Sequence, residues 1–318
     1  MTRLGPCYIQ VDREAAGQRI DNFLLRHLKG VPRSHLYRVL RRGEVRVNKG
    51  RVKPEYRLQA GDEVRIPPLR RADAPPPTRS AARDLTWIDD AVLFEDDRLL
   101  VIDKPAGLAV HGGSGLSYGF IELLRLARPQ QELELVHRLD RDTSGCLLIS
   151  KRRSTLRDLH QLLRENQVEK RYLALLAGPM PRAELSVDAP LRKNALQSGE
   201  RVVRIDFDEG KAAQTVFRTQ RSLAGASLVE ARILTGRTHQ IRVHAAHLGL
   251  PVAGDEKYGD AVRNRELRAF GLRRLFLHAA RLRFRAPHSG RVLQIEAPLP
   301  HDLTGVLGAL EAGTCASS

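Results

Sequence analysis

The chain has 318 residues, of which 42% are apolar, and its 53 Lys and Arg against 37 Asp and Glu give a formal net charge of +16. This composition excludes a disordered chain, and the length is enough for one small and one large domain. No apolar stretch approaches the roughly 18 residues of a membrane span, and residues 1–10 lack the apolar core of a secretory signal. We therefore expect a cytosolic globular protein that makes no membrane contact and whose positive field attracts nucleic acid.

The first predicted domain spans residues 16–68 and combines two helices with short strands. Apolar residues recur at helical spacing from Ile20 to Leu28, which predicts the first helix. Ser34 is placed to cap a second helix, and Gly43 is placed to end it. Strands are expected at 45–47, 51–53 and 62–66, with a turn at 48–50.

This segment is strongly basic. From Arg19 to Arg70 there are fourteen Lys or Arg against five Asp or Glu. A solvated surface is the alternative interpretation, but such surfaces usually mix both signs, so the excess favours contact with RNA or DNA. The candidate contacts are the cations of the second helix and the hairpin: Arg33, Arg38, Arg41, Arg42, Lys49, Arg51 and Lys53.

The same segment resembles the S4 RNA-binding domain. The matching stretches, in order, are residues 19–24, 33–34, 43–48 and 61–62. The resemblance implies a helix pair and a hairpin that grip structured RNA.

A linker at residues 69–84, rich in Pro and Arg, separates this domain from a large one at 85–310, and a small polar tail occupies 311–318. In the large domain short apolar runs alternate with turn residues and helices are few. We therefore expect an α+β fold with a mainly antiparallel mixed sheet. The expected strands are 99–102, 133–136, 146–149, 172–176 and 228–233, and the expected helices are 156–165 and 240–248.

A polar loop at residues 137–145 joins two of these strands and reads His-Arg-Leu-Asp-Arg-Asp-Thr-Ser-Gly. Loops held at the end of a sheet commonly carry catalytic side chains. Two carboxylates, Asp140 and Asp142, compete for such a role. The alternative is a simple turn in which short side chains bond the local backbone, and it explains Asp142, Thr143 and Ser144 better than Asp140.

This loop resembles the signature of the RluA-family pseudouridine synthases, in which the fourth residue is the essential aspartate. Three further stretches match that family in order, at residues 95–107, 169–172 and 235–244. The resemblance implies that Asp140 is the covalent catalyst, Tyr172 the active-site tyrosine and Arg242 the active-site arginine.

Together with the S4-like segment, the resemblance is greatest to the RluC-type branch of the family. That branch modifies uridines in large-subunit (23S) ribosomal RNA, which is the implied partner here. The segments that look typical of it are 31–34, 109–117 and 197–201, whereas 248–253 is less typical.

The implied reaction needs a carboxylate and no redox group. The N1–C1′ bond of uridine breaks, the base turns, and C5 bonds C1′, without net redox or hydrolysis, so we expect no cofactor and no metal. A carboxylate can attack C1′ or stabilise its cationic form, as carboxylates do in glycosidases. Arg242 paired to Asp140 would keep it ionised and aim it. The sequence leaves open whether Asp140 attacks C1′ or assists a glycal route.

The resemblance also suggests roles for neighbouring residues. The Tyr172 ring can stack on the extracted uracil and its hydroxyl can help take the C5 proton, although a buried strand tyrosine is the alternative. Arg138 is expected to fill the space that the flipped uridine leaves. Leu277 is expected to pack beside Tyr172, and His239 to orient Arg242 or contact a phosphate.

The sequence also suggests a zinc site and a non-catalytic RNA-binding function. The spacing of His239, His244 and His247 lacks the i, i+4 pair of zinc proteases, so no metal site is expected. A non-catalytic RNA-binding or ribosome-assembly protein on the same fold is the rival function. It would be marked by loss of Asp140, Tyr172 or Arg242, and all three are present. A monomer is the default oligomeric state.

Overall fold

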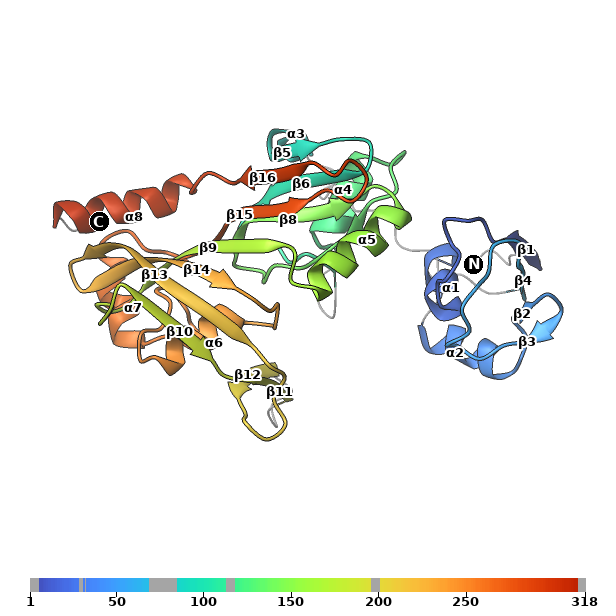
Figure 1. Cartoon of the computed structure of the whole chain (residues 1–318), viewed down its shortest axis with the longest axis horizontal. Coiled ribbons are helices and arrows are strands. Elements are labelled where there is room, and N and C mark those ends of the chain that lie inside the picture. The colour runs from blue at the N-terminus through green and yellow to red at the C-terminus, as the bar shows by residue number, and fades with distance from the viewer. Residues whose placement is uncertain are drawn as a thin grey trace. The chain divides into compact units, whose positions relative to one another are not determined.

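A computed structural model describes residues 6–28, 31, 33–68, 85–112, 118–195 and 201–313. The chain folds as two compact units, the second of which begins at Leu85 (Figure 1). The predicted linker, residues 314–318 of the predicted tail and parts of the three branch-typical segments lie outside the described residues. No helix among the described residues is long and apolar enough to cross a membrane.

The first unit joins two helices and a four-stranded antiparallel sheet through one apolar core. The helices are α1 (Ile20–His27) and α2 (Arg33–Arg41). The strands, in sheet order, are β1 (Cys7–Gln10), β4 (Glu63–Ile66), β2 (Arg46–Val47) and β3 (Gly50–Arg51). Both predicted helices are confirmed.

Three sequence-based expectations for this unit were wrong in detail. Ser34 lies inside the first turn of α2, because the helix already begins at Arg33. The hairpin strands are shorter than predicted, and the second begins at Gly50 because the turn takes only Asn48 and Lys49, whose φ angles are 49° and 68°. β1 was not predicted at all: it lies before residue 16, pairs with β4, and has no regular alternation of buried and exposed residues.

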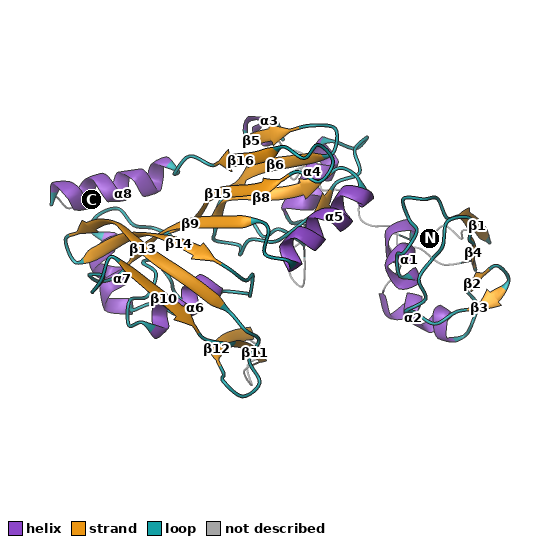
Figure 2. Cartoon of the chain, viewed as in Figure 1, coloured by secondary structure: helices purple, strands orange, loops and turns teal. Residues whose placement is uncertain are grey.

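The second unit is built on a ten-stranded sheet (Figure 2). Its main path runs β10-β13-β14-β9-β15-β8-β6-β5, while β16 pairs with β15 and β7 with β8. Every pair is antiparallel except β15 with β8, which confirms the predicted α+β class with a mainly antiparallel mixed sheet. The strands are β5 (Val92–Glu95), β6 (Leu99–Lys104), β7 (Glu134–Leu135), β8 (Ser144–Ser150), β9 (Glu169–Leu176), β10 (Glu184–Asp188), β13 (Gln214–Leu223), β14 (Ala226–Ile233), β15 (Leu277–Arg285) and β16 (Val292–Glu296).

A separate two-stranded hairpin and six helices complete the described part of this unit. The hairpin consists of β11 (Leu191–Ala195) and β12 (Arg201–Ile205). The helices are α3 (Trp87–Asp90), α4 (Phe120–Ala127), α5 (Arg153–Arg164), α6 (Gln240–His247), α7 (Ala261–Arg268) and α8 (His301–Ala312). Since α8 continues to Ala312, the first residues of the predicted tail are helical.

Both faces of the central strands are buried. Alternate residues of β6 show this: Leu100 and Ile102 share a core with α4, whereas Leu99 and Val101 share one with Leu159 of α5. A strand covered on both sides carries a continuous apolar run, which is the pattern that predicted these strands. The result is a rigid sheet whose strand ends can hold side chains in fixed positions.

Candidate active site

The loop that carries Asp140 enters β8 through a position that only glycine can occupy. Gly145 has a φ of +107°, and a Cβ placed on it would lie 2.3 Å from the carbonyl oxygen of Ala279 in β15. β8 and β15 are the parallel pair, with Gly145 opposite Ala279. This close approach fixes the end of the loop against the sheet.

Further contacts hold the loop itself. The amide of Thr143 donates to the carbonyl oxygen of Asp140 at 3.2 Å, which closes a turn. Ser144 Oγ lies 3.0 Å from Nδ1 of the buried His278. Asp142 was expected to bond the local backbone, but its carboxylate contacts the guanidinium of Arg141 at 3.1 Å instead. These contacts fix the backbone of Asp140 and do not involve its carboxylate.

The Asp140 carboxylate stands near two basic side chains without a hydrogen bond to either. Its Oδ2 lies 3.7 Å from an Nη1 of Arg242 and 3.8 Å from Nε2 of His239. Within the described part of the chain its side chain accepts no hydrogen bond, and it is 20% exposed. Its oxygens are therefore available to a bound molecule.

Arg242 is held by a different carboxylate, that of Asp255. Nε and Nη2 of Arg242 donate to Asp255 at 2.6 and 2.8 Å, and the guanidinium lies 5.0 Å from the centre of the Tyr258 ring. Burial would raise the pKa of Asp255, but the hydrogen bonds and charge of Arg242 outweigh it and hold that pKa below its usual value. The expected contact of Arg242 with Asp140 is present only at ion-pair distance.

His239 takes a backbone conformation that is uncommon for histidine. It precedes α6 with a φ of 54°, in the left-handed region. Its Nδ1 lies 2.8 Å from the hydroxyl of Tyr258 and its other nitrogen faces Asp140. Burial lowers its pKa, against the opposing charge of Asp140, and thereby favours the neutral ring. His239 thus contacts Asp140 and Tyr258, and no hydrogen bond joins it to Arg242 among the described residues.

Tyr172 lies in β9 and is only 8% exposed. It lines a small cavity of about 60 Å³ together with Asp140, Arg242 and Leu277. Leu277 was expected beside Tyr172, and both side chains line this cavity. Burial, followed by the charge of Asp140, raises the pKa of its phenol. The hydroxyl therefore stays protonated at neutral pH, which favours the stacking role over proton removal.

A larger cavity of about 590 Å³ opens beside this group. Among the described residues that line it, Asp140 is the only carboxylate. Its cations are the exposed Arg138, Arg164 and Arg237 and the buried Lys170. Two histidines also line it, and burial lowers the pKa of both, that of His137 to about 4. The cavity therefore presents positive charge around a single acid.

The predicted RNA contacts of the first unit are at its surface. Arg38, Arg41 and Arg42 in and after α2 are exposed, as are Lys49, Arg51 and Lys53 of the hairpin region. The side chain of Arg33 lies outside the described residues. Among the described residues, the nearest acid to this set is Glu44, whose carboxylate lies 3.8 Å from Arg42.

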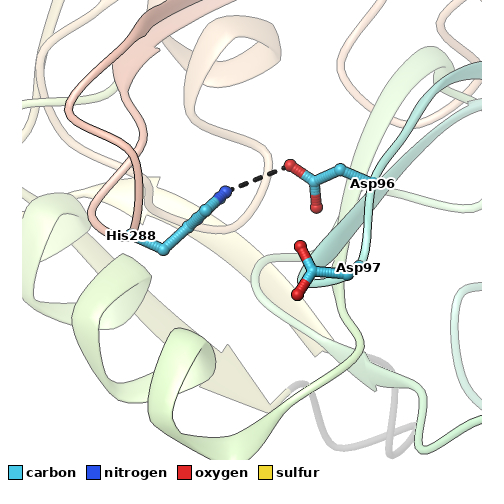
Figure 3. A group of neighbouring side chains, drawn as sticks. All are labelled: Asp96, Asp97 and His288. Carbon is cyan, nitrogen blue, oxygen red and sulfur yellow. Dashed lines mark hydrogen bonds and ion pairs between the residues drawn. The ribbon is translucent and has the colours of Figure 1, made fainter.

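A second polar cluster, Asp96, Asp97 and His288, has the residue types of a metal site (Figure 3). Its groups are already engaged. The Asp96 carboxylate accepts from the amides of Arg98 and Leu99 at 2.7 and 2.8 Å and from His288 at 3.2 Å. Asp97 forms ion pairs with Arg98 and Arg152. Guanidinium groups at this distance oppose cation binding, so the cluster serves to hold the turn between β5 and β6.

Comparison with known proteins agrees with this geometry. The family model for RNA pseudouridylate synthases matches residues 98–247, and that for the S4 domain matches residues 18–64. The "Ribosomal large subunit pseudouridine synthase C" of Yersinia pestis is 55% identical over 304 residues, which cover 95% of each chain. The protein of the same name from Escherichia coli K12 is 54% identical over 306 residues, 95% of this chain and 96% of that one.

The chain belongs to the RNA pseudouridylate synthases. A solved structure, human RNA pseudouridylate synthase domain containing 4, is 28% identical with a TM-score of 0.59, over 71% of this chain and 94% of that chain. A second human structure, RNA pseudouridylate synthase domain containing 1, is 24% identical with a TM-score of 0.55 and shares the fold.

In this pseudouridylate synthase, sequence reasoning missed several residues that build the site. Asp255 and Tyr258 were given no role, although they hold Arg242 and His239. Gln240 was missed: it bonds Thr235, the amide of Arg237 and Thr215. Lys104 was quoted in a matching stretch without a role, yet its Nζ donates to the carbonyl of Arg141 in the Asp140 loop.

Proposed function

We propose that this synthase converts uridines to pseudouridine in 23S ribosomal RNA, with Asp140 acting at C1′ of a flipped-out uridine. The observation that carries the proposal is that Asp140 is the only carboxylate among the described residues of the large cavity, has free oxygens, and lines the small cavity with Tyr172 and Arg242. The names of the relatives, which act on the large ribosomal subunit, support the choice of RNA.

The surrounding side chains fit the steps of this reaction. Tyr172 offers a ring on which the uracil can stack, and the neutral phenol argues against its removing a proton. Arg242, fixed by Asp255, supplies a positive charge near Asp140 without consuming its oxygens. Arg138 is exposed at the cavity wall, where it can enter the duplex as the uridine leaves.

The two units divide the work in this proposal. Residues 16–68, together with β1, would capture RNA through the exposed cations of α2 and the hairpin, and residues 85–310 would carry out the isomerisation. One chain supplies all three proposed catalytic residues, so we expect a monomer to be active. The reaction exchanges one bond to C1′ for another and needs neither cofactor nor metal. Since the proposed substrate is ribosomal RNA, we expect the protein in the cytosol.

The test is to incubate the protein with unmodified 23S RNA and map pseudouridine by carbodiimide-dependent stops of reverse transcription. We expect new stops with the wild type and none with Asp140→Asn. Asp142→Asn is the matched control, because Asp142 lies in the same loop but pairs with Arg141. Absence of stops with the wild type would favour the rival function of a non-catalytic assembly protein. Full activity in Asp140→Asn would refute Asp140 as the catalyst.

A further inference from the structure

Lys170 is a buried lysine whose ammonium group has no partner among the described residues. It is 7% exposed, and no described side chain or carbonyl forms a hydrogen bond or ion pair with it. It stands two residues before Tyr172 in β9, so both side chains point to the same face of the sheet. Burial alone lowers its pKa.

Lys104, which is fully buried, shows how the protein satisfies an enclosed ammonium group. Nζ of Lys104 donates to the carbonyl oxygens of Pro105, Leu108 and Arg141 at 2.6, 2.8 and 3.1 Å. Nζ of Lys170 has no such acceptor among the described residues and opens on the large cavity, where the protein leaves its hydrogen bonds unused. This points to an acceptor that arrives with a ligand.

The position of Lys170 indicates which part of a ligand it meets. It lines the large cavity with Asp140 and Tyr172, and a Cβ placed on Gly236 across that cavity would lie 4.0 Å from its Nζ. The exposed cations Arg138, Arg164 and Arg237 stand where a phosphate backbone can reach them. Lys170 instead lies at depth, on the same face as the ring that would stack on the base.

We propose that Lys170 is a further catalytic residue, which donates a hydrogen bond from Nζ to a carbonyl oxygen of the target uracil as the base detaches. This proposal rests on the proposed function. When the N1–C1′ bond breaks, its electron pair stays with the base, and the negative charge spreads over N1 and the two carbonyl oxygens. Lys170 keeps its proton throughout and stabilises this anion. Once C5 has bonded C1′, C5 loses its proton and N1 gains one, so the isomerisation balances.

The stabilisation is the same whether Asp140 attacks C1′ or a glycal forms, because uracil leaves with the electron pair in both routes. When the detached anion of the base is more stable, loss of Lys170 should slow N1–C1′ cleavage less. Fluorine at C5 withdraws electrons and stabilises the detached anion by itself. RNA with 5-fluorouridine at the target position therefore distinguishes two effects of Lys170. Stabilisation of the detached base should matter less with this RNA, whereas a contribution to RNA binding should be unchanged.

The experiment measures single-turnover cleavage of the N1–C1′ bond with saturating full-length enzyme on both RNAs. Lys170→Met keeps the length of the apolar stem and removes the charge. We expect it to slow cleavage at uridine by about a hundredfold, as for loss of one charge-stabilising donor, and at 5-fluorouridine by a clearly smaller factor. Lys170→Gln, which keeps a neutral donor, should lie between Met and wild type and serves if the Met variant fails to fold.

Lys151→Met is the matched control. Lys151 pairs with Glu95 at 2.7 Å and follows the far end of β8, roughly 20 Å along the strand from Asp140. The Lys151→Met variant should cleave the N1–C1′ bond in both RNAs at the wild-type rate. Unchanged rates in both Lys170 variants, or equal slowing on the two RNAs, would overturn the proposal. A defect confined to RNA affinity would assign Lys170 to a phosphate and overturn it as well. A wild type inactive on uridine RNA would instead refute the proposed function.

Discussion

Arg242 gives its two short hydrogen bonds to Asp255, at 2.6 and 2.8 Å, and stands 3.7 Å from Asp140. Asp255 is fully buried, and its Oδ1 also accepts from the amides of Lys257 and Tyr258. The arginine is thus positioned by a carboxylate that has no access to a substrate. Asp140 therefore lies near the positive charge of Arg242, while its carboxylate oxygens remain without a hydrogen bond from it.

The first prediction concerns this buried pair. Asp255→Asn should destabilise the protein by up to about 3–5 kcal/mol, because it leaves the Arg242 charge buried without its partner. Misplacement of the guanidinium should also slow pseudouridine formation by about a hundredfold. Denaturant unfolding and single-turnover assays measure the two effects. Glu266→Gln, which breaks an exposed pair with Arg263, is the control and should cost at most about 0.5 kcal/mol. Equal stability of the two variants would contradict this account.

The second prediction separates the two roles considered for Tyr172. Its phenol is buried and its pKa is raised, so it stays neutral at neutral pH. Tyr172→Phe keeps the ring and should retain activity within about tenfold, whereas Tyr172→Ala loses the stacking surface, worth about 1–3 kcal/mol. Product formation at saturating RNA measures both. If the Phe variant were as slow as the Ala variant, the hydroxyl would have a direct chemical role.

A third prediction follows from the buried histidines. Burial lowers the pKa of His137 from 6.5 to about 4, and the positive charge of Lys170 acts in the same direction. Between about pH 4 and 6.5, His137 is therefore protonated in the unfolded chain and largely neutral in the folded chain. The contribution of His137 to stability is complete above that pH and falls by at most about 3 kcal/mol as the pH drops to about 4.

The measurement is the free energy of unfolding as a function of pH. His137→Gln keeps an acceptor for the amide of Leu148, which His137 Nε2 accepts at 3.0 Å, and it should flatten the curve between about pH 4 and 6.5. Replacement of the exposed His301 by Gln controls for loss of an imidazole. A curve for His137→Gln as steep as that of the wild type would show that the ring is charged in the folded protein.

The sequence predicted the strands best where burial is complete. β6 and β8 are covered on both faces, so their apolar runs identified them, whereas the close contact of Gly145 with β15 was not predicted. β1 was missed because a short strand without regular burial leaves no such pattern.

The arrangement of the site depends on contacts distant in sequence, which periodicity does not encode. The partner of Arg242 lies thirteen residues ahead in a loop, and Lys104 reaches the Asp140 loop across 37 residues. The left-handed conformation of His239 runs against residue preference, and only the fold around it imposes it. These contacts required coordinates, whereas the identity of Asp140, Tyr172 and Arg242 as candidates required only the family pattern.

The last prediction concerns RNA capture by the first unit. Arg41 and Arg42 are exposed at the end of α2, and the proposal assigns them to phosphates. If each makes one phosphate contact, the double variant Arg41→Gln, Arg42→Gln should bind ribosomal RNA more weakly and reduce the slope of log affinity against log salt by roughly 1.4 to 1.8. Deleting residues 1–80 should reduce the slope further, while single-turnover chemistry at saturating RNA is retained.

Arg263→Gln and Arg265→Gln together provide the matched control, because they remove the same net charge from α7 of the second unit. Long-range attraction falls similarly in both double variants, so a difference in salt slope reports direct phosphate contacts rather than net charge. Titrations at several salt concentrations measure it. Identical slopes for the two double variants, or an unchanged slope after deletion of residues 1–80, would show that RNA is anchored elsewhere, leaving the cationic cavity around Asp140 as the main contact surface.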